Sequence, residues 1–247
     1  MVPLMEPLAS PIERRARREP RQRAATLLVL LAVWLAGGLL LLAVGLQHRV
    51  PVRDLMVDPV TVEGADWYAG MVTSVGVLGW SVAVCGSVVT AYTTALAGRA
   101  SAAAAFRGTA QLCGLLLLDD LFLLHSNVLP GLLGTSKVVV LACYGMLAVL
   151  WASSSLPELR RTRWELLVAS GAAFALSLGV DLGVHGPEAG GRLLVEDGAK
   201  LLGVLALAAW SVTTARDVIR SVVVTTEPAA PTGEPDQRLL VPLGAGR

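Results

Sequence analysis

Long apolar blocks alternate with short polar segments along the chain, and the blocks have the length of membrane spans. About 20 apolar residues in an α-helix cross the roughly 30 Å hydrocarbon core of a bilayer. Blocks of this kind predict six transmembrane helices, at residues 24–46, 69–96, 109–128, 136–151, 166–184 and 193–215. No clear small-residue cleavage site follows the first block, so it is expected to be an uncleaved span.

The remaining segments complete the domain organisation. Residues 1–23 form a basic tail, and residues 24–215 form the transmembrane domain. Residues 216–247 are predicted as a disordered tail, because the end of the chain is rich in Pro and Gly and lacks periodicity. The predicted fold class is therefore all-α, a polytopic membrane bundle.

Small residues recur at every fourth position in two of the predicted spans. At 3.6 residues per turn they form a stripe along one side of the helix, where a neighbouring helix can approach closely. The two stripes are Gly79, Ala83, Ser87, Ala91 and Ala95 in one span, and Gly171, Ala175, Gly179 and Gly183 in the other.

Composition and charge distribution agree with a membrane protein and suggest its orientation. Hydrophobic residues make up 54% of the chain and charged residues only 16%, against about 25% charged in soluble domains. Of the Lys and Arg residues, 15 fall in the two tails and the second and fourth loops, and four in the other loops. The positive-inside rule then places both termini in the cytoplasm.

These features also indicate where the protein is located and which partners it has. The composition is compatible with a GC-rich bacterial genome, so the expected location is the bacterial inner membrane. Membrane lipids are the expected partners, and the basic N-terminal tail is suited to anionic headgroups. Nothing in the sequence points to nucleic acid, and no protein partner can be identified.

The stretch LLLLDDLFLLHSNVLP at residues 115–130 places three ionisable residues inside an apolar block. Such residues are costly at membrane depth and by default mark a functional site. With the predicted span at 109–128, Asp119 and Asp120 are expected near the membrane midplane. His125 is then expected roughly 8 Å nearer the outside, at about 1.5 Å of rise per residue.

Two later spans add ionisable residues that are expected at a similar level. Asp181 and His185 are four residues apart and share one helix face, as do Glu196 and Lys200, with Asp197 beside them. Each pair also has a simpler interpretation, as a wetted pair at a helix end or a structural ion pair. The predicted topology nevertheless brings all three segments to the outer half of the membrane.

This predicted cluster has more carboxylates than cations, which low dielectric does not tolerate. Either some carboxylates are protonated, as in a proton relay, or a bound cation compensates them. Carboxylate and His ligands with an open water position describe a catalytic zinc site. The candidate ligands for zinc or another divalent metal are Asp119, Asp120, His125, Asp181 and His185. Glu196 or Asp197 is then the candidate general base, with Lys200 as a further catalytic candidate.

Two segments carry resemblances. DDLFLLH at 119–125 with EDGAKLLG at 196–203 resembles segments of uncharacterised bacterial multi-pass membrane proteins, which implies no activity. Asp181-x-x-x-His185, together with His125 and Asp119 or Asp120, is similar to the zinc ligands of the membrane hydrolase superfamily of alkaline ceramidases and adiponectin-receptor-like proteins. That resemblance implies a metal-dependent hydrolase, although Asp stands at 181 where the superfamily has His and six spans are found in place of seven.

The leading functional hypothesis is accordingly a metal-dependent hydrolase of a lipid or an amphipathic amide or ester. A proton- or cation-coupled transporter, with Asp119 and Asp120 beside Lys200, is the second hypothesis. The third is a non-enzymatic membrane subunit whose polar cluster is structural. Lys200 is expected to pair either with Glu196 on its own helix or with Asp119 or Asp120 across helices, because snorkelling from its depth is difficult.

Overall fold

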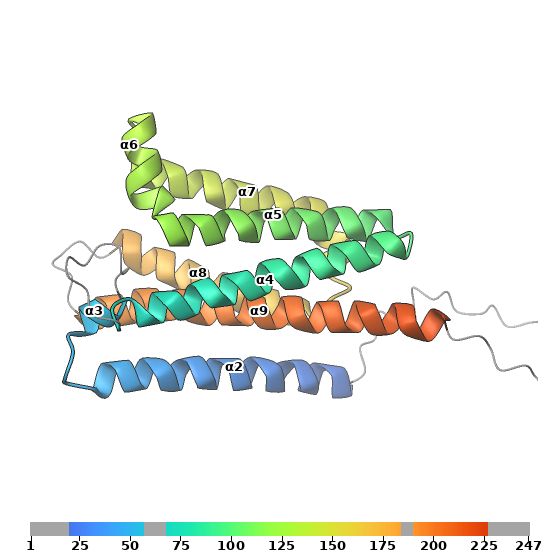
Figure 1. Ribbon diagram of the computed structural model, residues 1–247, viewed down its shortest axis with the longest axis horizontal. Helices are drawn as coiled ribbons and strands as arrows, with labels where there is room; N and C mark the ends of the chain where they lie inside the picture. Colours follow the sequence, from blue (N-terminus) through green and yellow to red (C-terminus); the bar gives the residue numbers. More distant parts are fainter. Residues whose placement is uncertain (1–19, 57–67, 184–189, 227–247) are drawn as a thin grey trace, which may run out of the picture.

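The computed structural model describes residues 20–56, 68–183 and 190–226, and all regular elements in these ranges are helices (Figure 1). The long helices are α2 (Pro20–Leu46), α4 (Met71–Leu96), α5 (Ala100–Phe122), α7 (Lys137–Leu159), α8 (Trp164–Gly183) and α9 (Gly190–Thr226). The short ones are α3 (Val52–Met56), the π-helical turn η2 (Leu124–Val128) and α6 (Leu129–Leu133). The predicted all-α class is confirmed.

Five of the long helices, α2, α4, α5, α7 and α8, are long and apolar enough to cross a membrane. Helix length and composition therefore support the prediction of a membrane protein. The predicted sixth span corresponds to α9, which is not among the five. Its uncharged stretch, residues 201–215, is only about 22 Å long, shorter than a hydrocarbon core of about 30 Å.

Helix α9 lies at the centre of the bundle and contacts α4, α8 and α2. Helix α5 packs on the other side of α4, and α7 packs on α5 at the edge of the bundle (Figure 1). The most buried long helix thus also carries more charged residues than any other long helix. A helix enclosed by neighbours does not need a surface that suits lipid.

The small-residue stripe of α4 faces α9, as the sequence pattern predicts. A Cβ added at Gly79 would lie 2.6 Å from Val204 Cγ1 of α9, and Ser87 is buried. The corresponding prediction for α8 is wrong, because that stripe faces away from the described helices. Gly171 and Gly179 are exposed, and a Cβ at either would meet no described atom within 4 Å.

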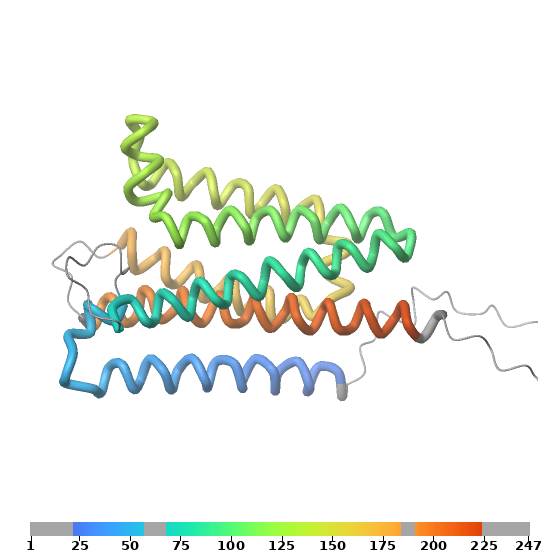
Figure 2. The backbone as a smooth tube through the Cα atoms, viewed as in Figure 1, coloured from blue at the N-terminus to red at the C-terminus, as the bar shows by residue number. Residues whose placement is uncertain are grey.

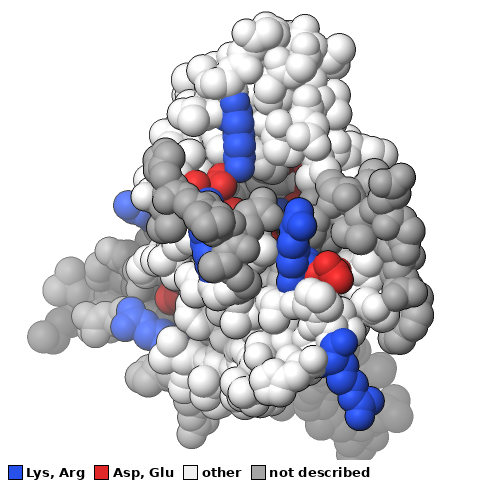
Figure 3. Space-filling view, turned by 90° about the vertical axis from the view of Figure 1, so that its left-hand side faces the viewer, with Lys and Arg blue, Asp and Glu red and all other residues white. Residues whose placement is uncertain are grey.

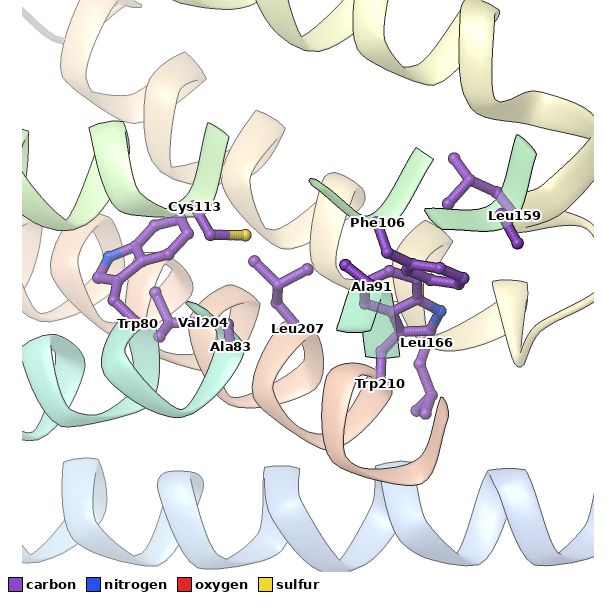
Figure 4. Close-up of a cluster of buried hydrophobic side chains, with 11 residues drawn as sticks. Trp80, Ala83, Ala91, Phe106, Cys113, Leu159, Leu166, Val204, Leu207 and Trp210 are labelled. Carbon is purple, nitrogen blue, oxygen red and sulfur yellow. The ribbon is translucent and has the colours of Figure 1, made fainter. Parts of the chain in front are cut away.

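Aromatic side chains fill the space where α4, α5, α8 and α9 meet (Figure 4). Trp80 of α4 stacks on Phe174 of α8, with ring centroids 5.5 Å apart. Phe106 of α5 and Trp210 of α9 form a second pair at 6.1 Å. Such pairs bury large apolar areas and contribute to holding the helices in register.

Two predicted boundaries are wrong in ways that affect the candidate site. The span predicted at 109–128 is helix α5, which begins at residue 100 and ends at residue 122. The tail predicted as disordered from residue 216 is helical over 216–226, because α9 continues to Thr226. Residues 227–247 lie outside the described ranges.

Candidate functional site at the end of the bundle near α3

The ionisable residues of the long helices gather at one end of the bundle, which we call the α3 end. At this end α2, α5 and α8 finish and α4, α7 and α9 begin (Figure 1). Figure 3 looks onto this end and shows acidic side chains gathered beside basic ones on an otherwise largely uncharged face. Asp119, Asp120, His125, Asp181, Glu196, Asp197 and Lys200 all belong to elements that meet here.

Helix α5 breaks sharply at the α3 end. It ends at Phe122, and Leu123 has φ 53°, the one positive φ at a non-glycine residue in the described part of the chain. The π-helical turn η2 follows, and Figure 2 shows the chain turning away from the bundle there. Strained backbone and π-helical turns are both found preferentially at functional sites.

This break corrects the predicted depth of the two aspartates. Asp119 and Asp120 lie in the last turn of α5, at the end of the helix and not at its middle. The midplane position predicted from a span at 109–128 is therefore wrong. Both are buried all the same, with exposed fractions of 7% and 6%. A buried carboxylate needs partners, and each of the two has a different set.

Asp119 organises the break. Its Oδ1 accepts the backbone N–H of His125 at 2.7 Å and the hydroxyl of Tyr144 at 3.1 Å. Its Oδ2 lies 2.6 Å from Nδ1 of the His125 ring. Asp119 thereby ties the end of α5 to η2 and to α7, and the structure brings together two of the predicted site residues.

The contact with Asp119 also determines what the His125 ring can do. Because a carboxylate accepts a hydrogen bond, we assign the proton to Nδ1. Nε2 then carries a lone pair, and it has no hydrogen-bond partner among the residues that the structure describes. A carboxylate in this position orients the ring, which suits either a general base or a metal ligand.

Asp120 pairs with Lys200 of α9, so the predicted bridge between these two helices is present. The pair borders a cavity of about 20 Å³, which is also lined by Asp197, Thr73 and Gly76. A cavity of that size has room for about one water molecule. The buried charge of Asp120 is therefore compensated across a helix interface.

A second network joins α7, α8 and α9 at the same end. Lys137 Nζ lies 2.7 Å from Oδ2 of Asp181, and Arg192 Nη2 donates to the Asp181 backbone carbonyl at 3.2 Å. Arg192 Nε also lies 3.5 Å from Oε2 of Glu196, four residues later. Asp181 of α8 and Glu196 of α9 are therefore held by two cations, Lys137 of α7 and Arg192 of α9.

The predicted metal ligands do not form one group in the described ranges. Three or more His, Cys, Asp or Glu side chains placed to hold one ion are not found there. Asp120 and Asp181 are engaged by Lys200 and Lys137, and His185 lies outside the described residues. Among the described candidate ligands, only Nε2 of His125 remains available to a metal. A catalytic zinc site has three protein ligands.

Three residues of the site were missed by reasoning from the sequence. Lys137 and Arg192 were counted as loop charges, yet both compensate carboxylates of the cluster. Tyr144 gave no signal beyond being the one Tyr of its predicted span. The spacing of Arg192 and Glu196, four residues apart on one helix, could have revealed that pair.

Comparison with known proteins gives a family and no activity. Neither the curated proteins nor the solved structures contain a match, and no likeness to alkaline ceramidases or adiponectin-receptor-like proteins is shown. The family model described as Domain of unknown function (DUF8692) matches residues 24–214, which agrees with the resemblance to an uncharacterised family. These residues include most of the chain, and the protein therefore belongs to this family.

Proposed function

We propose that the protein crosses the membrane six times, with both termini in the cytoplasm. The sixth span is then α9, which its neighbours α4, α8 and α2 separate from the lipid. The start of α2 and the end of α9 lie at the same end of the bundle (Figure 1), which supports an even number of crossings. Among the described helix ends and connections, those at that end hold most of the Lys and Arg residues, which supports a cytoplasmic location by the positive-inside rule. The α3 end then faces the outside.

We further propose that the α3 end carries an acid–base site and that the protein hydrolyses a lipid or an amphipathic amide or ester. The observation that carries this proposal is the contact of His125 Nδ1 with Asp119 at 2.6 Å beside the break in α5. His125 Nε2 accepts a proton from the water that attacks the substrate carbonyl, and Asp119 stabilises the imidazolium that forms. The imidazolium then gives this proton to the alcohol or amine that leaves as the C–O or C–N bond breaks. Tyr144 holds Asp119 in place through its hydroxyl.

A hydrolysis assay in mixed micelles tests this function. The substrates are p-nitrophenyl esters and p-nitroanilides with acyl chains of increasing length. Loss of a general base typically lowers the rate by about 10²–10⁴-fold, so we expect His125→Gln to lower kcat/KM by that factor. His48→Gln, at an exposed residue after α2, is the matched control. A wild type that hydrolyses none of the substrates, or an unaffected His125→Gln variant, would contradict the proposal.

A metal-dependent form of the same proposal uses His125 Nε2 as one ligand, with Asp119 orienting the ring. The described residues do not complete a ligand set, so no step of the reaction is assigned to a metal. Elemental analysis of gently purified protein decides between the two forms. Stoichiometric zinc that is lost in His125→Gln supports the metal form, and the absence of any stoichiometric transition metal removes it.

Proton coupling in a transporter is a second candidate function, and the buried Asp120–Lys200 pair favours it. Paired ionisable residues within membrane helices commonly mark proton or ion pathways. Proteoliposomes with an internal pH-sensitive dye and an imposed membrane potential provide the test. Proton flux that Asp120→Asn abolishes supports this candidate, and wild-type protein without flux above empty liposomes removes it.

A further inference from the structure

A long apolar groove runs between α4 and α9 toward the end of the bundle opposite to the α3 end. It has a volume of about 700 Å³, within the range of about 300–1,000 Å³ typical of ligand sites. Its α4 side extends from Leu78 to Val89, about 16 Å of helix. That length is about half of a hydrocarbon core of about 30 Å, the depth of one leaflet.

The groove exists because small side chains line its floor. Ser81, Cys85 and Gly86 of α4 and Ala215 of α9 leave the space, and larger apolar residues such as Val82 form its walls. Cys85 is exposed in the described structure. Because this part of α4 lies in a helix suited to cross a membrane, the surroundings of the groove are hydrocarbon.

Two arginines, Arg216 and Arg220, close one end of the groove. They are four residues apart on α9 and therefore share one face of the helix. Arg216 lies 3.4 Å from Asp217 in an exposed pair, whereas Arg220 has no ion-pair partner among the described residues. Exposed pairs of that kind contribute little, so both guanidinium groups are available to an anion.

Neighbouring contacts place these arginines at the level of the membrane surface. Asp217, between them, accepts from Arg163 Nε at 3.2 Å, and Arg163 precedes α8. Ser221 is contacted at 3.4 Å by Arg99, in the short connection between α4 and α5. The loops that join the apolar helices thus lie beside Arg216 and Arg220, where lipid headgroups are found.

We propose that this groove binds an anionic phospholipid, with an acyl chain along the apolar floor and the headgroup phosphate against Arg216 and Arg220. Charge complementarity favours this occupant, because guanidinium groups bind phosphate through paired hydrogen bonds. A second copy of this chain would bring its own Arg216 and Arg220 into the interface if the contact were symmetric. The site lies away from His125 and does not depend on the proposed function.

Native mass spectrometry of the full chain in mild detergent tests the proposal. The probes are dioleoyl phosphatidylglycerol and dioleoyl phosphatidylcholine, added separately. We expect the wild type to bind phosphatidylglycerol more tightly than phosphatidylcholine. Each arginine near an anionic headgroup is worth about 5-fold in affinity, so Arg216→Gln with Arg220→Gln should weaken phosphatidylglycerol binding roughly 30-fold.

Matched controls separate the site from general charge effects. Arg160→Gln with Arg161→Gln removes the same charge from exposed positions at the end of α7, and should leave the binding of both lipids unchanged. Cys85→Phe fills the groove without altering charge and should weaken the binding of both lipids. Cys143→Phe, at an exposed cysteine of α7, should change neither. Melting temperatures within a few degrees of the wild type show that the variants fold.

Several results would overturn the proposal. Equal wild-type affinity for the two lipids would remove the role of the arginines. An equal loss in the two arginine double variants would show general attraction by surface charge. Unchanged binding in Cys85→Phe would place the lipid outside the groove. A wild-type dimer that Cys85→Phe dissociates would identify a second copy as the occupant.

Discussion

Replacement of Lys200 by Met tests whether the charges at the α3 end hold the helices together. Lys200 pairs with Asp120 across the α5–α9 interface, and Asp120 is only 6% exposed. Removing one partner of a buried pair leaves the other charge uncompensated, which typically costs about 3–5 kcal/mol. The Lys200 side chain is 34% exposed, so we expect the lower end of that range, about 3 kcal/mol.

The assay is thermal unfolding in detergent, followed by circular dichroism. At roughly 2–4 °C per kcal/mol for a chain of this size, Lys200→Met should lower Tm by roughly 6–12 °C. Combining it with Asp120→Asn should recover part of the loss, because the neutral amide no longer leaves a buried charge without a partner. A double-mutant cycle then isolates the interaction between the two side chains.

Lys137→Met is the matched control for this prediction. Lys137 also pairs with a carboxylate of the α3 end and is 38% exposed. Its partner Asp181 keeps a second cation, Arg192, at 3.9 Å. The loss should therefore stay below about 1 kcal/mol, as for exposed pairs. A Lys200→Met variant as mild as Lys137→Met, without rescue by Asp120→Asn, would refute the inter-helix bridge.

Three further predictions concern packing, the site and topology. Gly79→Ala should lower the free energy of unfolding by about 1–3 kcal/mol, because the added methyl group overpacks the contact with α9. Gly171→Ala, where a Cβ meets open space, should not lower it, and equal effects of the two changes would contradict the close α4–α9 contact. Tyr144→Phe removes the hydroxyl that donates to Asp119 and should lower the free energy of unfolding by about 1.5–3 kcal/mol in the same melting assay. An unchanged Tm would contradict a stabilising role of that hydrogen bond. In a cysteine-free chain in intact cells, an impermeant maleimide should label Arg49→Cys and spare Arg161→Cys, and the reverse pattern would invert the proposed topology.

Helices and their approximate order could be predicted from the sequence because apolar block length carries that information directly. Their ends could not, since the break in α5 depends on contacts made by Asp119 with residues that follow it. Apolar composition continues through Leu123 and beyond, so nothing in the pattern marks the helix end. The depth assigned to Asp119 and Asp120 was wrong for this reason.

The sequence indicated which ionisable residues gather at the α3 end, but it did not indicate how they pair. An excess of carboxylates suggested a bound cation only because Lys137 and Arg192 were treated as loop charges. Contacts between the ends of different helices depend on the tertiary structure. Residue spacing along the sequence shows only partners that lie on the same helix. The two stripes of small residues show the same limit of sequence spacing. The stripe of α4 faces α9, whereas the similar stripe of α8 faces open space.

Nitrogen NMR of isotope-labelled histidine tests the central claim most directly, namely that Asp119 fixes the His125 ring as an acid–base group. The chain has only three His residues, so His125→Gln assigns the signal. We predict a neutral ring protonated at Nδ1 with an unprotonated Nε2, and loss of that tautomer preference in Asp119→Asn. A wild-type signal from the Nε2-protonated tautomer, or one unchanged by Asp119→Asn, would contradict the account.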